Sequence, residues 1–168
     1  MKKTKPHKKA DDYHHMMDLI LTDFKDSQKE GMKWNLQLKN KCFDVIFKIP
    51  VLFIIGDTEG QDKICGRYTS RSNVSHLCRC CNVPFQETDN PEYKYKLNNH
   101  RRIMKKIENS SKDQLKNLSM HKLTNAWKDI EFCDSERGIF GAVCGDIMHC
   151  LQHGLFSYLV KLLFDQKK

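Results

Sequence analysis

The spacing of apolar residues predicts an opening helix from Asp11 or Asp12 to about Glu30. Either aspartate can act as its N-cap. Gly31 is placed to end it, because glycine adopts a left-handed backbone without steric cost. One face of this helix carries five apolar residues, which we expect in the core: Tyr13, Met16, Met17, Ile20 and Phe24. We assign no function to the adjacent His14 and His15.

Two strands are predicted after this helix. A turn and a loop are expected over residues 31–36, and then a strand over Phe43–Ile49. Pro50 breaks the ladder before a second strand, Val51–Ile55, which Gly56 stops. The second run is apolar throughout, as is typical of a strand buried on both faces. Two strands alone make a marginal sheet with unpaired edges, so we expect the chain to self-associate or to need a partner.

The second half of the chain is predicted to be mainly helical, which gives an α+β fold class, mostly helical. A loop is expected over Phe132–Val143. The final helix contains the most apolar segment, Ile147–Phe164, but polar residues such as Lys161 interrupt it, and we expect a buried helix and no membrane span. The expected helices are Tyr93–Asn109, a short one capped by Ser111, one capped by Ser119 through about Ile130 with Leu123, Ala126, Trp127 and Ile130 buried, and Asp146–Phe164.

Charge and the N-terminus narrow the possible partners and location. A chain of 168 residues fits one domain, with or without an insertion, and its formal net charge of +8 favours an anionic partner, DNA before an acidic membrane surface. Residues 1–10 form a basic tail that we expect to be disordered, either a nuclear localisation signal, a phosphate-contacting arm or a solubilising terminus. This tail lacks the apolar region of a signal peptide, so we expect a nuclear or cytoplasmic protein that is not secreted.

The helix predicted at Tyr93–Asn109 is strongly basic. It could lie along a phosphate backbone, or its charges could simply form a solvated helix face. The residues that would contact DNA are Arg101, Arg102, Lys105 and Lys106.

The eight cysteines are expected to be reduced, free or metal-bound. Cys78 and Cys81 form a C-x-x-C, a knuckle that can supply two of the four ligands of a structural Zn²⁺. His149 and His153 lie four residues apart, share one helix face and can supply the other two. Cys80 is one residue too close for this geometry but could substitute. The alternative is a pair of free thiols.

Asp57 follows the predicted strand, where carboxylates often hold Mg²⁺. Metal-assisted phosphoryl transfer needs two or three acids that meet in space, and only Glu59 and Asp62 are near in sequence. The residues alone therefore favour a capping or turn-forming role for Asp57.

The order of these motifs resembles the catalytic core of cut-and-paste DNA transposases of the CACTA/Plavaka-like group. The shared features are the strand before Gly56-Asp57, the C-x-x-C of Cys78 and Cys81, and a D-x-x-H at Asp146 and His149. This resemblance implies an RNase H-like fold with a D…D…E triad, in which Asp57 is the second aspartate and shares Mg²⁺ with the first. It also implies Zn²⁺ at Cys78, Cys81, His149 and, by extension, His153.

The chain departs from this family pattern. The strands that carry the first aspartate and the helix that carries the final glutamate have no counterpart here. The resemblance thus implies a fragment: a partial RNase H-like core over residues 11–66, and a zinc-stapled helical insertion over residues 67–168. No DNA cleavage is expected from this chain alone.

Three hypotheses follow. The first is a partial or decayed transposase whose complete form cuts and joins DNA by metal-dependent phosphoryl transfer. The second is a stand-alone zinc-stabilised nucleic-acid-binding module. The third is an α-rich interaction domain with neither activity.

Overall fold

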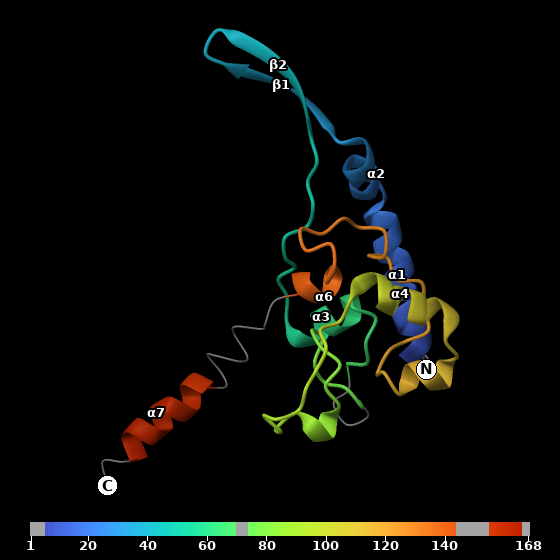
Figure 1. Cartoon of the computed structure of the whole chain (residues 1–168), viewed down its shortest axis with the longest axis vertical. Coiled ribbons are helices and arrows are strands. Elements are labelled where there is room, and N and C mark those ends of the chain that lie inside the picture. Colours follow the sequence, from blue (N-terminus) through green and yellow to red (C-terminus); the bar gives the residue numbers. More distant parts are fainter. Residues whose placement is uncertain (1–5, 70–73, 144–154, 166–168) are drawn as a thin grey trace, which may run out of the picture.

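The computed structural model describes residues 6–69, 74–143 and 155–165. Over these ranges the protein has an α+β structure in which helix predominates over strand (Figure 1). Its elements, in chain order, are α1 (Pro6–Ile20), α2 (Thr22–Glu30), β1 (Met32–Leu38), β2 (Lys41–Phe47), α3 (Thr58–Ile64), the 3-10 turn η2 (Phe85–Glu87), α4 (His100–Asn109), α5 (Lys112–Lys116), α6 (Ile139–Ala142) and α7 (Phe156–Asp165).

The predicted opening helix is confirmed, although it is divided in two and begins earlier. The expected burial of Met16 and Ile20 is wrong, since they are 51% and 64% exposed. α1 starts at Pro6, so the end of the expected disordered tail is helical. Leu21 separates α1 from α2, and Gly31 ends α2 with a φ of 77°. A Cβ at Gly31 would collide with the side chain of Ile46, so the left-handed turn and the close packing both require glycine here.

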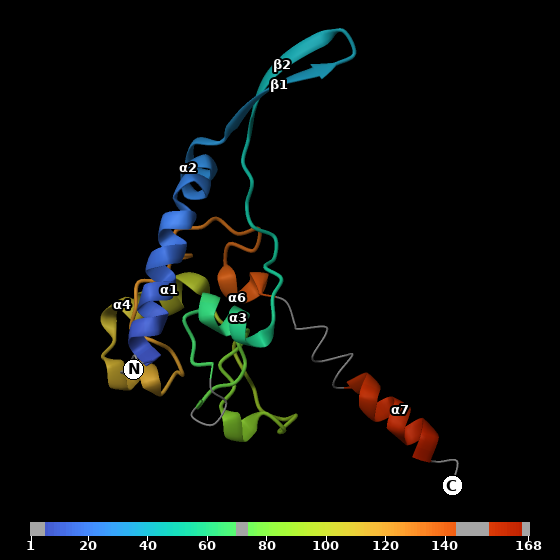
Figure 2. The ribbon, with the colours of Figure 1, turned by 180° about the vertical axis from the view of Figure 1, so that it is seen from behind.

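The loop expected over residues 31–36 is wrong, because this segment forms strand β1. β1 and β2 make an antiparallel hairpin that runs from the Met32–Phe47 pair to the Leu38–Lys41 pair, with a two-residue turn between them. β2 starts and ends two residues before the predicted strand. The hairpin extends away from the helices in Figures 1 and 2, and most of its side chains are exposed.

The strand expected at Val51–Ile55 is also wrong. This segment makes two isolated parallel bridges, from Val51 to Phe132 and from Ile54 to Val143. The residues between and beyond these contacts, Phe53 and Ile55, are 51% and 82% exposed. Only one side of the run faces the core, so its apolar composition does not reflect burial on both faces.

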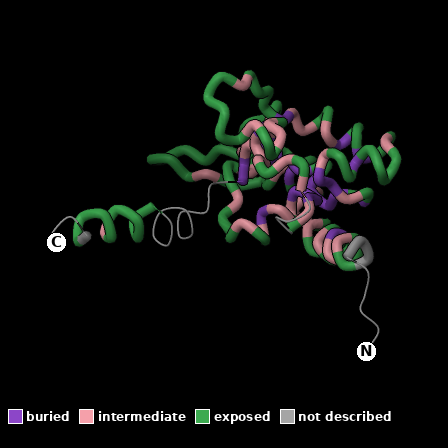
Figure 3. Tube along the Cα trace, turned by 90° about the horizontal axis from the view of Figure 1, so that it is seen from below, coloured by how far each residue is buried: buried purple, intermediate pink, exposed green. Residues whose placement is uncertain are grey.

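The core cluster combines residues of α4, α6 and the segment between α5 and α6, against which α1, α2 and α3 place partly buried side chains. In Figure 3 the buried residues gather in the main body of the molecule and not in the helix nearest the C-terminus. The predicted burial of Leu123, Ala126, Trp127 and Ile130 is confirmed. The fully buried side chains of this cluster include Cys65, Ile107, Leu115, Ile139 and Phe140, with Met120, Ala126, Trp127 and Ile130 beside them.

Gln28 joins α2 to the second half of the chain. Its Nε2 donates to the carbonyl oxygens of Ile49 and Glu131, at 2.9 Å each. Its Oε1 accepts from the Glu131 amide, also at 2.9 Å. Since these bonds satisfy the whole amide group, Gln28 can lie 2% exposed without an unpaired polar atom.

The helices of the second half are shorter than predicted. The helix capped by Ser111 is confirmed as α5, with a complete capping box to Gln114. The helix predicted from Ser119 is wrong. Ser119 has a φ of 57°, and its hydroxyl accepts from the amides of Ser75 and His76 instead of capping a helix.

Two further segments near the C-terminus differ from expectation. The loop predicted over Phe132–Val143 contains the short helix α6. α7 confirms helix within the predicted Asp146–Phe164 segment, but not its burial, since Leu159 and Leu163 are 49% and 68% exposed. α7 lies apart from the other elements in Figures 1 and 2. Among the described residues, no helix combines the length and apolarity that crossing a membrane would require.

Candidate nucleic-acid interface

α4 separates an apolar side from a basic side. Met104 and Ile107 are 8% and 2% exposed, and they anchor the helix to the core. The four residues predicted to contact DNA are exposed on the other side: Arg101, Arg102, Lys105 and Lys106. Because residues three and four apart share a helix face, the sequence pattern correctly placed these cations together.

The helix is shorter than predicted because its N-terminal part is used elsewhere. Asn99 caps α4 by accepting from the Arg102 amide at 3.0 Å. The residues before Asn99 are extended and pair with the cysteine knuckle, which we define as Cys78–Cys81. Backbone hydrogen bonds that serve this pairing cannot also close helical turns.

Hydrogen bonds fasten the knuckle and the adjoining Asn82 to this extended segment. The Asn98 amide donates to the Cys80 carbonyl at 2.8 Å, and the Asn98 side chain donates to the Arg79 carbonyl at 2.8 Å. The Asn82 amide donates to the Lys96 carbonyl at 3.0 Å, and the Lys96 amide donates to Asn82 Oδ1 at 2.7 Å. The knuckle therefore fixes the path of the chain that enters α4.

The three knuckle thiols lie close enough to affect one another. Hydrogen bonds from the Cys80 and Cys81 thiols lower the pKa of Cys78 to about 5, against the opposing effect of burial. The hydrogen bond to Cys78 raises the pKa of Cys80, and burial raises the pKa of Cys81. A lowered pKa favours the thiolate form of Cys78, and zinc is bound by cysteine thiolates.

The other two predicted zinc ligands, His149 and His153, lie outside the described residues, as does Asp146. Within the described ranges, no three His, Cys, Asp or Glu side chains form a group that could hold a metal ion. The structure thus brings Cys78 and Cys81 together, and the four-ligand Zn²⁺ site stays a prediction.

Asp57 caps α3, in agreement with the role that the residues alone favoured. Its side chain accepts from the Gly60 amide at 2.7 Å, and its carbonyl accepts from the Gln61 amide at 2.9 Å. Nearby Glu59 pairs with Lys63 at 2.7 Å. The described residues place no second carboxylate with Asp57 in a metal site, so its catalytic role, and the Mg²⁺ that it would share, remain predictions from the family resemblance.

A buried charge cluster was missed by the sequence analysis. Arg67 is 5% exposed, and its Nε lies 3.9 Å from Asp62 Oδ1. Arg79 reaches the same oxygen at 3.2 Å. These residues belong to different segments and form no spacing motif, so only the folded chain shows that two guanidinium groups share one carboxylate.

No family model, curated protein or solved structure matches this chain.

Proposed function

We propose that this protein binds DNA through the basic side of α4. The observation that carries the proposal is the exposure of Arg101, Arg102, Lys105 and Lys106 above a helix side that is buried in the core. A rigid helix holds these four cations at fixed spacing, as contacts along a phosphate backbone require. The net charge of +8 supports the same class of partner.

The order of Gly56-Asp57, the C-x-x-C and the D-x-x-H along the sequence supports a transposase setting for this DNA contact. In that setting the chain corresponds to part of an RNase H-like core with a zinc-stapled helical insertion. Asp57 would supply one carboxylate to the Mg²⁺ of a complete enzyme, and Cys78, Cys81, His149 and His153 would hold Zn²⁺. The complete form would cut and join DNA by phosphoryl transfer, and this chain alone would not.

A second candidate is a stand-alone zinc-stabilised nucleic-acid-binding module. The observation that favours it is the capping bond of Asp57, which gives this carboxylate a structural role within α3. Both candidates use the same α4 surface, so one binding experiment tests the shared proposal.

Replacing all four α4 cations by alanine should abolish most of the salt dependence of DNA binding. Each phosphate contact contributes about 0.9 to the slope of log affinity against log salt, so the slope should fall by about 3.6. Fluorescence anisotropy with a short duplex, measured between low and physiological salt, gives this slope. Asp57→Asn keeps a capping side chain and should leave the slope unchanged.

A matched variant controls for net charge. Lys33, Lys39, Lys41 and Lys48 are exposed in and beside the hairpin, and their replacement by alanine removes the same total charge. This control should bind DNA with nearly the slope of the unaltered protein. An equal loss in both quadruple variants would show that net charge, and no particular surface, attracts DNA, and an unaltered chain that fails to bind DNA would overturn the proposal.

A further inference from the structure

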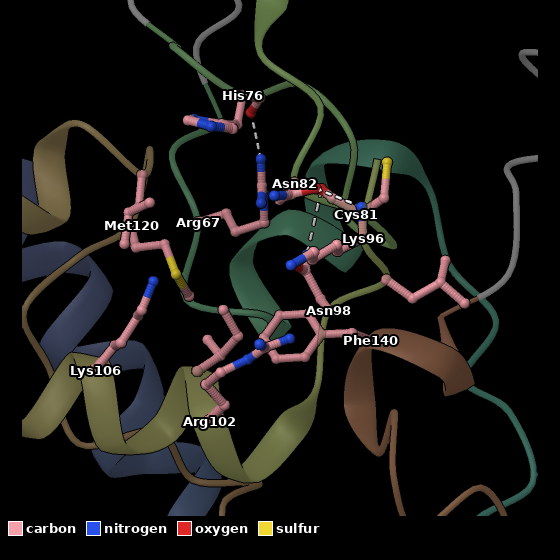
Figure 4. Close-up of a pocket in the computed structure, with 13 residues that line it drawn as sticks. Arg67, His76, Cys81, Asn82, Lys96, Asn98, Arg102, Lys106, Met120 and Phe140 are labelled. Carbon is pink, nitrogen blue, oxygen red and sulfur yellow. Dashed lines mark hydrogen bonds between the residues drawn. The ribbon is translucent and has the colours of Figure 1, made fainter. Parts of the chain in front are cut away.

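A small pocket lies between α4, the segment that follows the knuckle, and Arg67 (Figure 4). Its volume is about 120 Å³. None of the thirteen residues that line it is aspartate or glutamate. Four of them carry cationic side chains: Arg67, Lys96, Arg102 and Lys106. The pocket therefore concentrates positive charge that the lining itself does not neutralise.

Arg67 differs from the other three cations of the pocket, because its charged side chain is buried. Its guanidinium donates to the carbonyl of His76 and shares the carboxylate of Asp62 with Arg79. The side chains of Arg79 and Asp62 are each 14% exposed. Burying a charge is costly unless it is paired, and the carboxylate of Asp62 is shared between two guanidinium groups. An anion in the pocket would add a partner for Arg67 and for the three other cations of the lining.

The size of the pocket limits what the anion can be. A cavity needs about 10–15 Å³ of accessible volume to hold one water, so this pocket can hold several waters or one tetrahedral oxyanion. Pockets for larger organic ligands are typically about 300–1,000 Å³. A phosphate group therefore fits, whereas a whole nucleotide does not.

We propose that this pocket binds a single phosphate group, held by Arg67, Lys96, Arg102 and Lys106. Guanidinium groups suit this ligand because their paired N–H donors match the oxygens of phosphate. This inference deepens the proposed function. When the bound phosphate is part of DNA, the pocket proposal rests on DNA binding through α4. Arg102 and Lys106 belong both to the exposed side of α4 and to the pocket, so a strand lying along α4 would bring a backbone phosphate to the pocket. Free phosphate would satisfy the same chemistry.

Lys96 allows the pocket to be tested without disturbing the fold. Its backbone pairs with Asn82, but its side chain is exposed and lies outside the four-residue DNA surface. Lys94, two residues earlier, is also exposed and does not line the pocket. Lys96→Ala and Lys94→Ala therefore make the same charge change inside and outside the pocket.

The experiment is a titration of the full chain and both variants with inorganic phosphate, followed by a second titration with a short DNA duplex. Calorimetry or amide chemical shifts report the binding, with chloride at equal ionic strength as the reference. Lys96→Ala should weaken phosphate binding about ten-fold, the loss expected for one charge-assisted contact. Lys94→Ala should leave it unchanged. The duplex should show the same difference between the variants if its backbone supplies the phosphate.

Each outcome separates the pocket from the proposed DNA function. Equal behaviour of the two variants toward phosphate, or no saturable phosphate binding, overturns the pocket while DNA binding through α4 can still stand. Phosphate binding that depends on Lys96 in a chain that does not bind DNA supports the pocket with free phosphate as its ligand, and overturns the proposed function.

Discussion

His14 connects three parts of the chain through one imidazole ring. Its Nε2 donates to the Lys63 carbonyl at 3.0 Å, which leaves Nδ1 to accept from the Ala126 amide at 3.2 Å. This pair of partners requires the neutral ring, because a protonated Nδ1 would meet an N–H donor. Burial, the largest effect, lowers the pKa of His14 from its ordinary value. The fold therefore depends on a histidine that stays unprotonated.

We predict that stability falls as the pH falls below about 6.5, the ordinary pKa of histidine. The unfolded chain binds a proton there before folded His14 does, so the contribution of His14 is complete above pH 6.5 and is lost as the pH falls through its lowered folded pKa. Burial also lowers the pKa of His76 and His100, which adds to the effect. Urea unfolding at several pH values measures this dependence.

Substitutions assign the effect to His14. His14→Gln keeps a donor and an acceptor without a titrating group, so its stability should vary less with pH. His14→Ala leaves both backbone partners unpaired and should cost about 2 kcal/mol. His15→Gln alters the exposed neighbour and should keep the original pH profile. An unchanged pH profile in His14→Gln would mean that another group controls the acid sensitivity.

At the scale of elements, the start of α4 depends on the pairing of the knuckle with the segment before it. Pairing between Cys80–Asn82 and Lys96–Asn98 brings the chain to Asn99, where capping begins the basic helix. Disturbing the knuckle should therefore misplace the α4 surface even though the proposed DNA surface contains no cysteine. A metal bound at the knuckle would act on DNA binding through the same dependence.

We predict one Zn²⁺ per chain, with Cys78→Ser losing both the metal and the folded state. A structural zinc site contributes about 10–16 kcal/mol of apparent binding free energy, more than the stability of a typical domain, so its loss should unfold the region. Elemental analysis and thermal melts with and without a chelator measure this. Cys42→Ser changes an exposed cysteine of the hairpin and should keep the zinc. A metal-free chain that melts normally would contradict the prediction.

Local rules correctly predicted the elements whose residues determine their own structure. Gly31 ends α2, Ser111 caps α5, Asp57 caps α3, and the basic spacing of α4 places its cations on one side. Predictions failed where distant partners decide. Val51–Ile55 has the composition of a buried strand, yet its bridge partners are single residues, 81 and 89 positions later in the chain. The residues of the Arg67 pocket come from several segments of the chain, so no short sequence motif could predict it.

At the scale of the whole molecule, the described residues leave apolar side chains exposed on several elements, among them the hairpin and α7. The hairpin exposes Trp34 at 58% and Ile46 at 62%, and α7 exposes Leu159 and Leu163. The two elements project away from the other helices in Figures 1 and 2. Clusters of exposed apolar side chains commonly mark association surfaces.

We therefore predict that the chain self-associates as its concentration rises. Hydrophobic association should persist or strengthen with salt, whereas DNA binding should weaken. Sedimentation velocity at several protein and salt concentrations distinguishes the two. The double change Leu159→Gln and Leu163→Gln should shift the protein toward monomer if α7 takes part. A single monomeric species throughout would rule out association through these surfaces.

The hydrogen bonds that join Gln28 to Ile49 and Glu131 have a consequence for folding during synthesis. The Glu131 partner of Gln28 follows 103 residues later, and the Ala126 partner of His14 follows 112 residues later. At a translation rate of about 5–20 residues per second, α1 and α2 would wait roughly 5–20 s before their partners exist. During that interval the growing chain presents two helices and an apolar hairpin without their core. A chaperone that meets the nascent chain would therefore engage this N-terminal stretch first.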